Sequence, residues 1–303
     1  MRMSQHKSPQ DPNPADPKKQ GPKPDFPQER IEHPGLDSEL TPHADHGETS
    51  YRGLGRLTDR VALITGGDNG IDRAVAIAFA REGADVMISY LPEEESDAEE
   101  TARWVRDAGR TVVKLPGDIQ DEQHCRRLVD HCVQELGGLD ILVNNAAYQM
   151  SREGIADIST EQFDRVLKTN VYAMFWLCKA ALPHLTEGSA IINTTSIQAY
   201  EPSPNLLDYA TSKAAILNFT KGLAQELAPK GIRVNSVAPG PIWTPLIPAT
   251  LPAGKVGEFG ADTPLGRAGQ PAELAPLYVF LASDDSTYVT GERIGATGGR
   301  PLP

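Results

Sequence analysis

The feature that most constrains this chain is a regular alternation of short apolar runs with longer amphipathic stretches, which starts near residue 51. A short apolar run that ends in turn-forming residues is typical of a buried strand, whereas apolar residues three and four positions apart indicate a helix. Strands are therefore predicted over residues 61–65, 85–90, 111–118, 140–145, 190–196, 233–240 and 290–296. Helices are predicted between them over residues 70–82, 93–108, 121–136, 160–185, 209–228 and 271–282.

Strands that alternate with helices imply right-handed crossover connections, and therefore a parallel sheet covered by helices on both faces. We expect an α/β fold, a doubly wound and Rossmann-like parallel sheet, in one domain over residues 51–303. Ligands of such sheets bind beyond the carboxyl ends of the strands, so functional residues are sought at the strand ends.

The first 50 residues differ from the rest of the chain in composition. They contain nine prolines and almost no apolar periodicity. Proline lacks an amide donor and restricts the residue before it, so this segment resists regular helix and sheet. Two interpretations remain open for residues 1–50, a disordered tail or an extended arm that lies on the domain or on a neighbouring subunit.

Charge and composition exclude several classes of protein. The net charge is −12 and no basic run is present, which argues against a nucleic-acid binder. No apolar stretch reaches the roughly 18 residues of a membrane span, and the first residues lack the apolar core of a signal peptide, so we expect a cytoplasmic protein. The pairs His124–Cys125 and His131–Cys132 lie about 10 Å apart along a predicted helix, too far for one metal ion, so no metal site is predicted.

The first predicted strand runs into a glycine-containing loop, Gly66 to Ile71, and then into a helix. Glycines let the backbone approach a pyrophosphate closely, and the helix N-terminus offers free amides to that anion. The third and fourth strands end in residues that suit the rest of a dinucleotide. Asp118–Ile119 could meet an adenine, and the small residues of Asn145–Ala146–Ala147 could pack on a ribose.

A candidate catalytic group follows the fifth strand. Ser196 ends the strand, and Tyr209 and Lys213 are four positions apart, on one face of the next helix. A neighbouring ammonium favours the phenolate, so Lys213 is expected to lower the pKa of Tyr209 from its usual value near 10. Tyr209 would then act as general acid or base beside hydride transfer, while Ser196 holds the substrate oxygen.

With these residues, the chain resembles the short-chain dehydrogenase/reductase family over residues from about 55 to 300. The resemblance rests on the glycine loop, Asn144–Asn145–Ala146, Ser196, the Tyr209–Lys213 pair and Pro239–Gly240. It implies an NAD(P)-dependent oxidoreductase that acts on a small carbonyl compound or secondary alcohol. The proline-rich extension and residues 194–200 resemble a bacterial subgroup often linked to general stress.

The resemblance also implies roles for further residues. Asn170 would position a proton-relay water, Lys213 would bind the nicotinamide ribose, and Ile242 and Thr244 would flank the nicotinamide carboxamide. The predicted catalytic residues are Ser196, Tyr209, Lys213 and Asn170. The predicted cofactor-binding residues are Gly66, Asp68, Asn69, Gly70, Ile71, Tyr90, Leu91, Asp118, Ile119, Asn145, Ala146, Ala147, Thr195, Tyr209, Lys213, Pro239, Gly240, Ile242 and Thr244.

One position departs from the family pattern, because Asp72 replaces the last glycine of the loop motif. Its bulk and charge would lie near the pyrophosphate, although it could instead cap the helix N-terminus. We therefore expect weak cofactor binding. The alternative function is a dinucleotide-binding protein with little or no turnover.

The cofactor type and the substrate pocket are less constrained. The second strand ends in Ser89–Tyr90–Leu91 with neither the carboxylate of an NAD site nor an arginine for NADP, so both cofactors remain open. Glu93 to Glu95 are expected to point to solvent. Candidate pocket residues are Tyr148, Gln149, Gln198, Tyr200, Trp243 and Leu246.

An oligomer is also expected. The predicted helices 160–185 and 209–228 carry apolar residues on several faces, which one sheet cannot cover alone. Such helices form a homotetramer interface in the family that the chain resembles.

Overall fold

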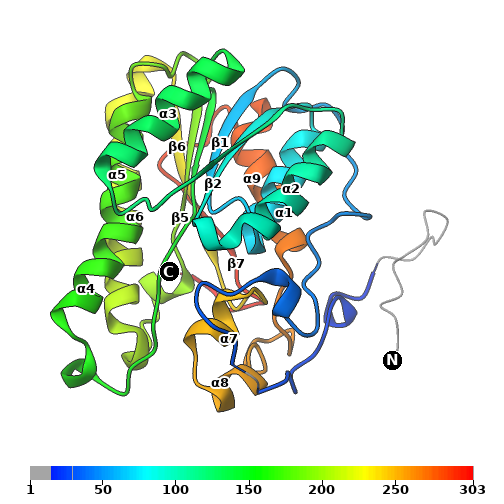
Figure 1. Ribbon diagram of the computed structural model, residues 1–303, viewed down its shortest axis with the longest axis vertical. Helices are drawn as coiled ribbons and strands as arrows, with labels where there is room; N and C mark the ends of the chain where they lie inside the picture. Colours follow the sequence, from blue (N-terminus) through cyan, green and yellow to red (C-terminus); the bar gives the residue numbers. More distant parts are fainter. Residues whose placement is uncertain (1–14, 29, 303) are drawn as a thin grey trace.

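A computed structural model describes residues 15–28 and 30–302. Its centre is one seven-stranded sheet in which all neighbouring strands are parallel, in the order β3-β2-β1-β4-β5-β6-β7 (Figure 1). This confirms the predicted doubly wound sheet. The strands are β1 (Val61–Thr65), β2 (Asp85–Tyr90), β3 (Val112–Pro116), β4 (Ile141–Asn144), β5 (Ala190–Thr194), β6 (Arg233–Pro239) and β7 (Arg293–Ala296).

Helices cover both faces of the sheet and give two apolar layers (Figure 1). One face carries α1 (Gly70–Arg81), α2 (Glu95–Asp107) and α9 (Pro271–Ala282), and the other carries α3 (Glu122–Leu136), α5 (Ala173–Ala181) and α6 (Leu207–Leu227). The central strands β1 and β5 are buried along their whole length, as their unbroken apolar sequences require.

The local sequence explains where several helices begin. Asp121 caps α3 by accepting a hydrogen bond from the Gln123 amide, and Ser159 caps α4 (Thr160–Leu167) through the Gln162 amide. Helix α9 begins with Pro271 in its first turn, where the missing amide donor costs nothing.

The predicted helix over residues 160–185 is divided in the structure. A π-helical turn, Lys168–Tyr172, separates α4 from α5 and contains Asn170. π turns inside α-helices are frequent at functional sites, and simple apolar spacing does not reveal them. Two short helices were also missed, α7 (Leu246–Thr250) and α8 (Ala253–Gly257), because each is too short to show a periodic pattern.

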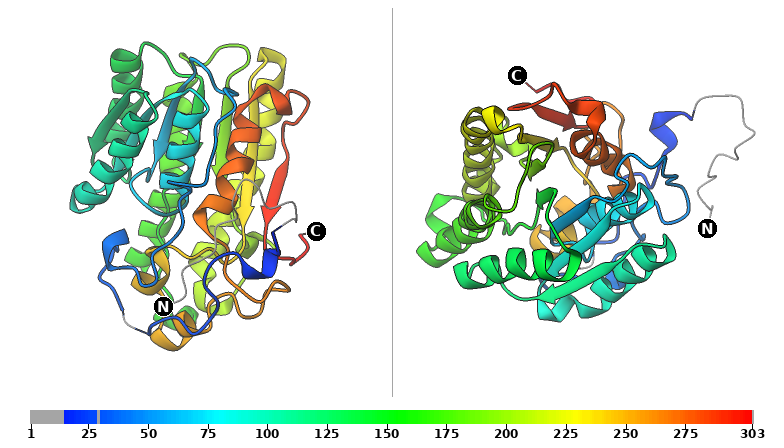
Figure 2. Two further views of the ribbon diagram at one scale, coloured as in Figure 1. Left: turned by 90° about the vertical axis from the view of Figure 1, so that its right-hand side faces the viewer. Right: turned by 90° about the horizontal axis from the view of Figure 1, so that it is seen from above.

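The described part of the first 50 residues contacts the sheet domain at the end where α7 and α8 lie (Figure 2). It has two 3₁₀ turns, η1 (Pro17–Lys19) and η2 (Asp37–Glu39). Phe26 stacks on Trp243 with ring centroids 3.9 Å apart, and the Trp243 Nε1 donates to the Pro42 carbonyl at 2.8 Å. Residues 1–14, which include the first prolines of the predicted arm, lie outside the described residues.

Within the described ranges, no helix combines the length and the apolar character needed to cross a membrane.

Candidate active site

The glycine loop joins β1 to α1 at the carboxyl edge of the sheet. Gly66 and Gly70 have positive φ angles of 72° and 55°, which side-chain-bearing residues adopt rarely. A Cβ on Gly67 would lie 2.4 Å from the Ile88 side chain, so only glycine lets the loop pack on β2. Arg73, in the first turns of α1, donates to the Asp68 carbonyl at 2.9 Å and fixes the loop from behind. The loop backbone and the start of α1 thus form a cradle that fits a pyrophosphate.

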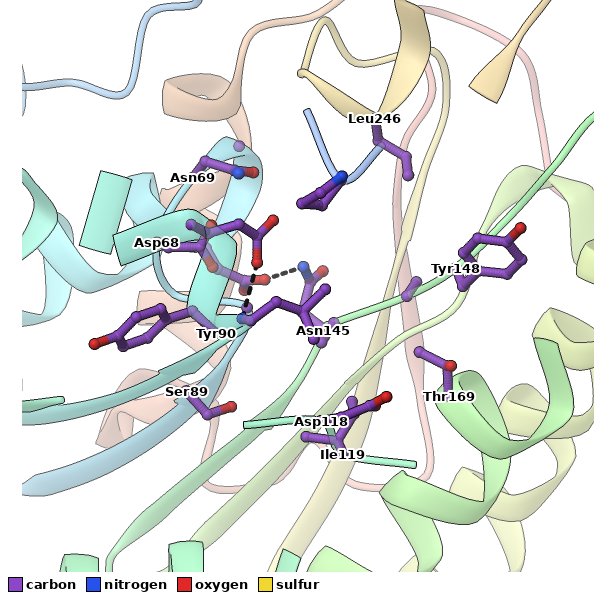
Figure 3. Close-up of a pocket in the computed structure, with 18 of the residues that line it drawn as sticks. Asp68, Asn69, Ser89, Tyr90, Asp118, Ile119, Asn145, Tyr148, Thr169 and Leu246 are labelled. Carbon is purple, nitrogen blue, oxygen red and sulfur yellow. Dashed lines mark hydrogen bonds between the residues drawn. The ribbon is translucent and has the colours of Figure 1, made fainter. Parts of the chain in front are cut away.

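Two adjoining cavities lie along this edge of the sheet and share Ile71, Asn145, Ala147, Thr244 and Leu246. The first measures about 190 Å³ and extends from the glycine loop to the ends of β2 and β3 (Figure 3). The predicted cofactor-binding residues that line it are Gly66, Asp68, Asn69, Gly70, Ile71, Tyr90, Leu91, Asp118, Ile119, Asn145, Ala146, Ala147 and Thr244. The second, about 400 Å³, adds Thr195, Ser196, Tyr209, Lys213, Pro239, Gly240 and Ile242.

Ser196, Tyr209 and Lys213 meet on the wall of the second cavity. Lys213 Nζ lies 5.4 Å from the centre of the Tyr209 ring and donates to the Thr194 carbonyl at 2.8 Å. Ser196 Oγ accepts from the Gln198 amide at 3.1 Å and thereby caps a 3₁₀ turn, η6 (Ile197–Ala199). The strand end and the helix face therefore bring together a hydroxyl, a phenol and an amine around one cavity.

The pKa shifts differ from the sequence-based expectation. Burial raises the pKa of Tyr209 to about 12, and the Ser196 hydroxyl only partly opposes this. Burial also lowers the pKa of Lys213 to about 7, while the Asp72 carboxylate opposes the decrease. The expected lowering of the Tyr209 pKa by Lys213 is not seen in this structure, because desolvation of the phenolate outweighs the hydrogen bond from Ser196.

Asn170 lies in the π turn Lys168–Tyr172. Its Oδ1 accepts from the Tyr148 amide at 2.7 Å, and its Nδ2 donates to the Tyr148 carbonyl at 3.0 Å and to Ser212 Oγ at 2.9 Å. A third, small cavity of about 10 Å³ touches both Asn170 and Lys213. That volume is about the space that one water molecule needs.

Asp72 projects into the first cavity and is only 1% exposed. Its Oδ2 accepts a hydrogen bond from Asn145 Nδ2 and lies 3.4 Å from where a Cβ on Gly66 would stand. Its Oδ1 has no hydrogen-bond partner among the described residues. Burial raises its pKa well above the usual range, and the charge of Asp68 adds to the increase. The proposed capping role is not seen, because Asn69 is the N-cap residue of α1 and Asp72 bonds Asn145 instead.

A second correction concerns the acidic run after β2. Glu93 and Glu95 are exposed, as expected, but Glu94 is 9% exposed and lines the first cavity. A 3₁₀ turn, η3 (Pro92–Glu94), precedes α2 and turns this side chain inward, where it accepts from the Leu91 amide at 2.9 Å. Burial raises the pKa of Glu94 to about 7. Asp68, in the glycine loop, is 2% exposed. Burial raises its pKa well above the usual range, and the Glu94 charge adds to the increase.

The proposed pocket residues divide into two groups. Tyr148, Gln149, Gln198 and Leu246 line the cavities, whereas Tyr200 and Trp243 do not. Tyr200 packs beneath the Arg293 guanidinium, 5.0 Å from its ring centre. Trp243 is 1% exposed because Phe26 covers its ring.

Sequence reasoning missed several residues that line the first cavity, among them His33, Pro34 and Arg165. His33 and Pro34 come from the proline-rich segment, where no motif marks them. Arg165 belongs to α4, and its guanidinium lies 4.0 Å from the centre of the Tyr148 ring. Figure 3 shows Tyr148 across the cavity from Asp68, Asn69 and Tyr90.

Comparison with known proteins places this site in a family. A family model described as enoyl-(acyl carrier protein) reductase matches residues 66–300. The chain is 54% identical over 279 residues to the uncharacterized oxidoreductase YghA of Escherichia coli, covering 92% of this chain and 95% of that protein. It is 52% identical over 272 residues to general stress protein 39 of Bacillus subtilis, covering 90% and 95%.

Solved structures agree with these relatives. A short-chain dehydrogenase from Burkholderia cenocepacia, in complex with NADP, superposes with a TM-score of 0.76 at 34% identity, covering 80% of this chain and 98% of that chain. The fold, the glycine loop and the sequence relatives all indicate the same protein family. This chain therefore belongs to the short-chain dehydrogenase/reductase family, is of its bacterial stress-associated type, and is an NAD(P)-dependent oxidoreductase.

Proposed function

We propose that this protein interconverts a secondary alcohol and a carbonyl compound in the second cavity, with Tyr209 as the general acid or base. One observation carries the proposal. Ser196, Tyr209 and Lys213 line the same cavity, and that cavity shares lining residues with the one formed by the glycine loop. Gly240 and Thr244, which line this cavity, would hold the nicotinamide of a bound cofactor, and that cofactor would supply or accept the hydride.

The four predicted catalytic residues have distinct roles in this proposal. Ser196 holds the substrate oxygen against Tyr209, and Tyr209 exchanges a proton with that oxygen as the hydride moves. Its pKa of about 12 favours the protonated phenol near neutral pH, which suits carbonyl reduction. Lys213, with a pKa of about 7, can take up or release the proton that Tyr209 passes on. Asn170 and the small cavity beside it offer a place for a relay water.

We propose NAD as the preferred cofactor. The adenosine end of the first cavity carries Asp68 and Glu94, close to the end of β2 where dinucleotide folds hold the ribose. In their ionised form, carboxylates there accept from a ribose 2′-hydroxyl and repel a 2′-phosphate. Arg73 offsets Asp68 only in part, because its guanidinium pairs with Asp37 at 2.9 Å and Asp97 at 3.4 Å. The Burkholderia structure contains NADP, so the proposed preference for NAD rests on the carboxylates of Asp68 and Glu94 alone.

We further propose that residues 51–303 form the catalytic domain, residues 1–50 an arm, and four chains a homotetramer. Exposed aromatic side chains on and between α4 and α5 support an interface on that side. Phe163, Tyr172 and Phe175 are 40%, 47% and 45% exposed.

The test is a screen of NADH and NADPH oxidation over a panel of aldehydes and ketones, with NAD reduction over secondary alcohols as the reverse assay. Turnover with at least one substrate, and tighter binding of NADH than of NADPH, are expected. Cofactor binding without turnover on any substrate would instead support a dinucleotide-binding protein, the alternative that Asp72 motivates. Tighter binding of NADPH would refute the role of Asp68 and Glu94.

A further inference from the structure

The arm takes part in the wall of the first cavity. His33 and Pro34 line that cavity together with the glycine loop and the ends of β2 and β3. We propose that residues 31–37, here called the crossing segment, complete the dinucleotide site and retain the adenosine and pyrophosphate half of the cofactor. This inference rests on the assignment of the first cavity to the dinucleotide.

One guanidinium connects the crossing segment to the glycine loop. Arg73 donates to the Asp68 carbonyl of the loop at 2.9 Å, and its Nη1 donates to the Asp37 carboxylate of the arm at 2.9 Å. Arg73 is 3% exposed and Asp37 is 9% exposed. A buried pair of this kind is costly to break from one side, because the remaining charge is left without a partner. The position of the arm and the shape of the loop are therefore linked through Arg73.

Further contacts hold the crossing segment in place over the loop and α7. The Asp37 amide donates to Asp97 Oδ2 at 2.8 Å, and Asn69 Nδ2 of the loop donates to the Gly35 carbonyl at 3.4 Å. Gly35 has a φ angle of 89°, and a Cβ there would lie 3.0 Å from the Pro245 carbonyl, just before α7. The segment thus runs between the cofactor loop and α7 with no room for a larger residue at its centre.

At the cavity, His33 contacts the opposite wall. Its ring lies edge-on to Tyr148, with ring centroids 5.2 Å apart, and the Arg165 guanidinium covers the same tyrosine at 4.0 Å. Arg165 Nε has no hydrogen-bond partner among the described residues. The arm, Tyr148 and α4 together form a bridge across the cavity. The Arg165 guanidinium in this bridge is a cation, which suits an anionic ligand beneath it. Such a cover excludes water from the bound dinucleotide and slows its departure.

The relatives give this arrangement a context. YghA and general stress protein 39 align with 92% and 90% of this chain. The Burkholderia structure aligns with only 80% of this chain, although 98% of that structure is included in the alignment. A short-chain dehydrogenase therefore folds and binds NADP without a counterpart for about a fifth of this chain. The family model begins at residue 66, so the crossing segment lies outside the part of this chain that the model matches.

The test compares two changes in the crossing segment with a matched neighbour, all in the full-length chain. His33→Ala removes the side chain at the cavity, and Gly35→Ala displaces the segment from the loop and α7. Ser38→Ala is the control, because Ser38 is exposed and lies directly after the crossing segment. We expect the dissociation constant for NADH to rise about three- to tenfold in the two test variants and less than about twofold in the control. The KM for NADH should rise in parallel while kcat at saturating NADH stays near that of the wild type.

Hydrogen–deuterium exchange gives a readout that does not depend on any variant. NADH should protect the backbone amides of residues 31–37 in the wild-type protein and leave residues 15–25 unchanged. Unchanged NADH binding in both test variants, or equal weakening in Ser38→Ala, would overturn the proposal, as would unaltered exchange in residues 31–37. Failure of the wild type to bind either dinucleotide would instead refute the cofactor assignment on which the inference rests.

Discussion

Asp72 offers the sharpest test of how this chain binds its cofactor, because its carboxylate occupies the cradle that the glycine loop forms. Its Oδ2 lies 3.4 Å from the position that a Cβ on Gly66 would take. Its Oδ1 has no hydrogen-bond partner among the described residues. We expect Asp72→Gly to tighten dinucleotide binding. Asp72→Asn separates the causes, since it removes the charge and keeps the bulk.

The magnitude follows from Coulomb's law. Two unit charges about 4 Å apart repel by about 1 kcal/mol in water-like surroundings and by about 4 kcal/mol at an effective dielectric constant of about 20. Because burial raises the pKa of Asp72, protonation relieves part of this repulsion, and the lower end of the range applies. A gain of about 1.4 kcal/mol corresponds to a tenfold lower dissociation constant.

The pH dependence gives an independent measurement of the same effect. The charged form of Asp72 repels the pyrophosphate, so binding takes up a proton and the wild-type affinity should fall as pH rises through the raised pKa of Asp72. Lys213, Asp68, Asn145 and Tyr278 also face this carboxylate, and all remain in the variant. Asp72→Asn should therefore lose only the part of the pH dependence that belongs to Asp72.

The assay is calorimetric titration of NADH into the wild type, Asp72→Asn and Asp72→Gly at several pH values, with thermal melts to verify folding. Tighter binding in both variants identifies charge as the dominant cause, and tighter binding in the glycine variant alone identifies bulk. Equal or weaker binding in Asp72→Gly refutes the reasoning and shows that the hydrogen bond to Asn145 turns the carboxylate away from the phosphates.

Three further predictions follow from the site and its surroundings. Tyr209→Phe should lower turnover by about 10²–10⁴-fold while NADH binding persists, and near-normal turnover on a good substrate would contradict the proposed mechanism. Light scattering at micromolar concentration should give about four times the chain mass of 32.7 kDa, and Phe175→Asp should reduce it; a monomeric mass for the wild type would refute the homotetramer. Phe26→Ala should destabilise the protein by about 3–5 kcal/mol, because it removes the ring stacked on Trp243, and Phe26→Leu should cost less. An unchanged melting temperature in Phe26→Ala would show that the arm contributes little to stability.

Much of the fold could be read from the sequence, because its signals are local and periodic. Apolar runs such as residues 61–65 and 85–90 match β1 and β2 residue for residue. Parallel strands place their carboxyl ends on one edge, so residues that follow successive strands must meet there. The sequence alone therefore predicts one site that contains the glycine loop, Asn145, Ser196 and the Tyr209–Lys213 pair.

Other features depended on contacts between residues far apart in the chain. The docking of the arm rests on Phe26, Asp37 and Pro42, whose partners lie on α1 and near α7, and a proline-rich segment carries no periodicity that predicts such contacts. The inward turn of Glu94 depends on a single 3₁₀ turn.

The pKa values were decided by tertiary structure as well, since burial is a property of the whole fold. Sequence spacing placed Lys213 one helical turn from Tyr209, and this correctly put both at one cavity. It could not show that the same burial raises the pKa of Tyr209 and lowers that of Lys213. Chain order thus determined which residues meet, whereas the packing around them determined their charge, because the free energy of an ionised group depends on how much water the fold leaves beside it.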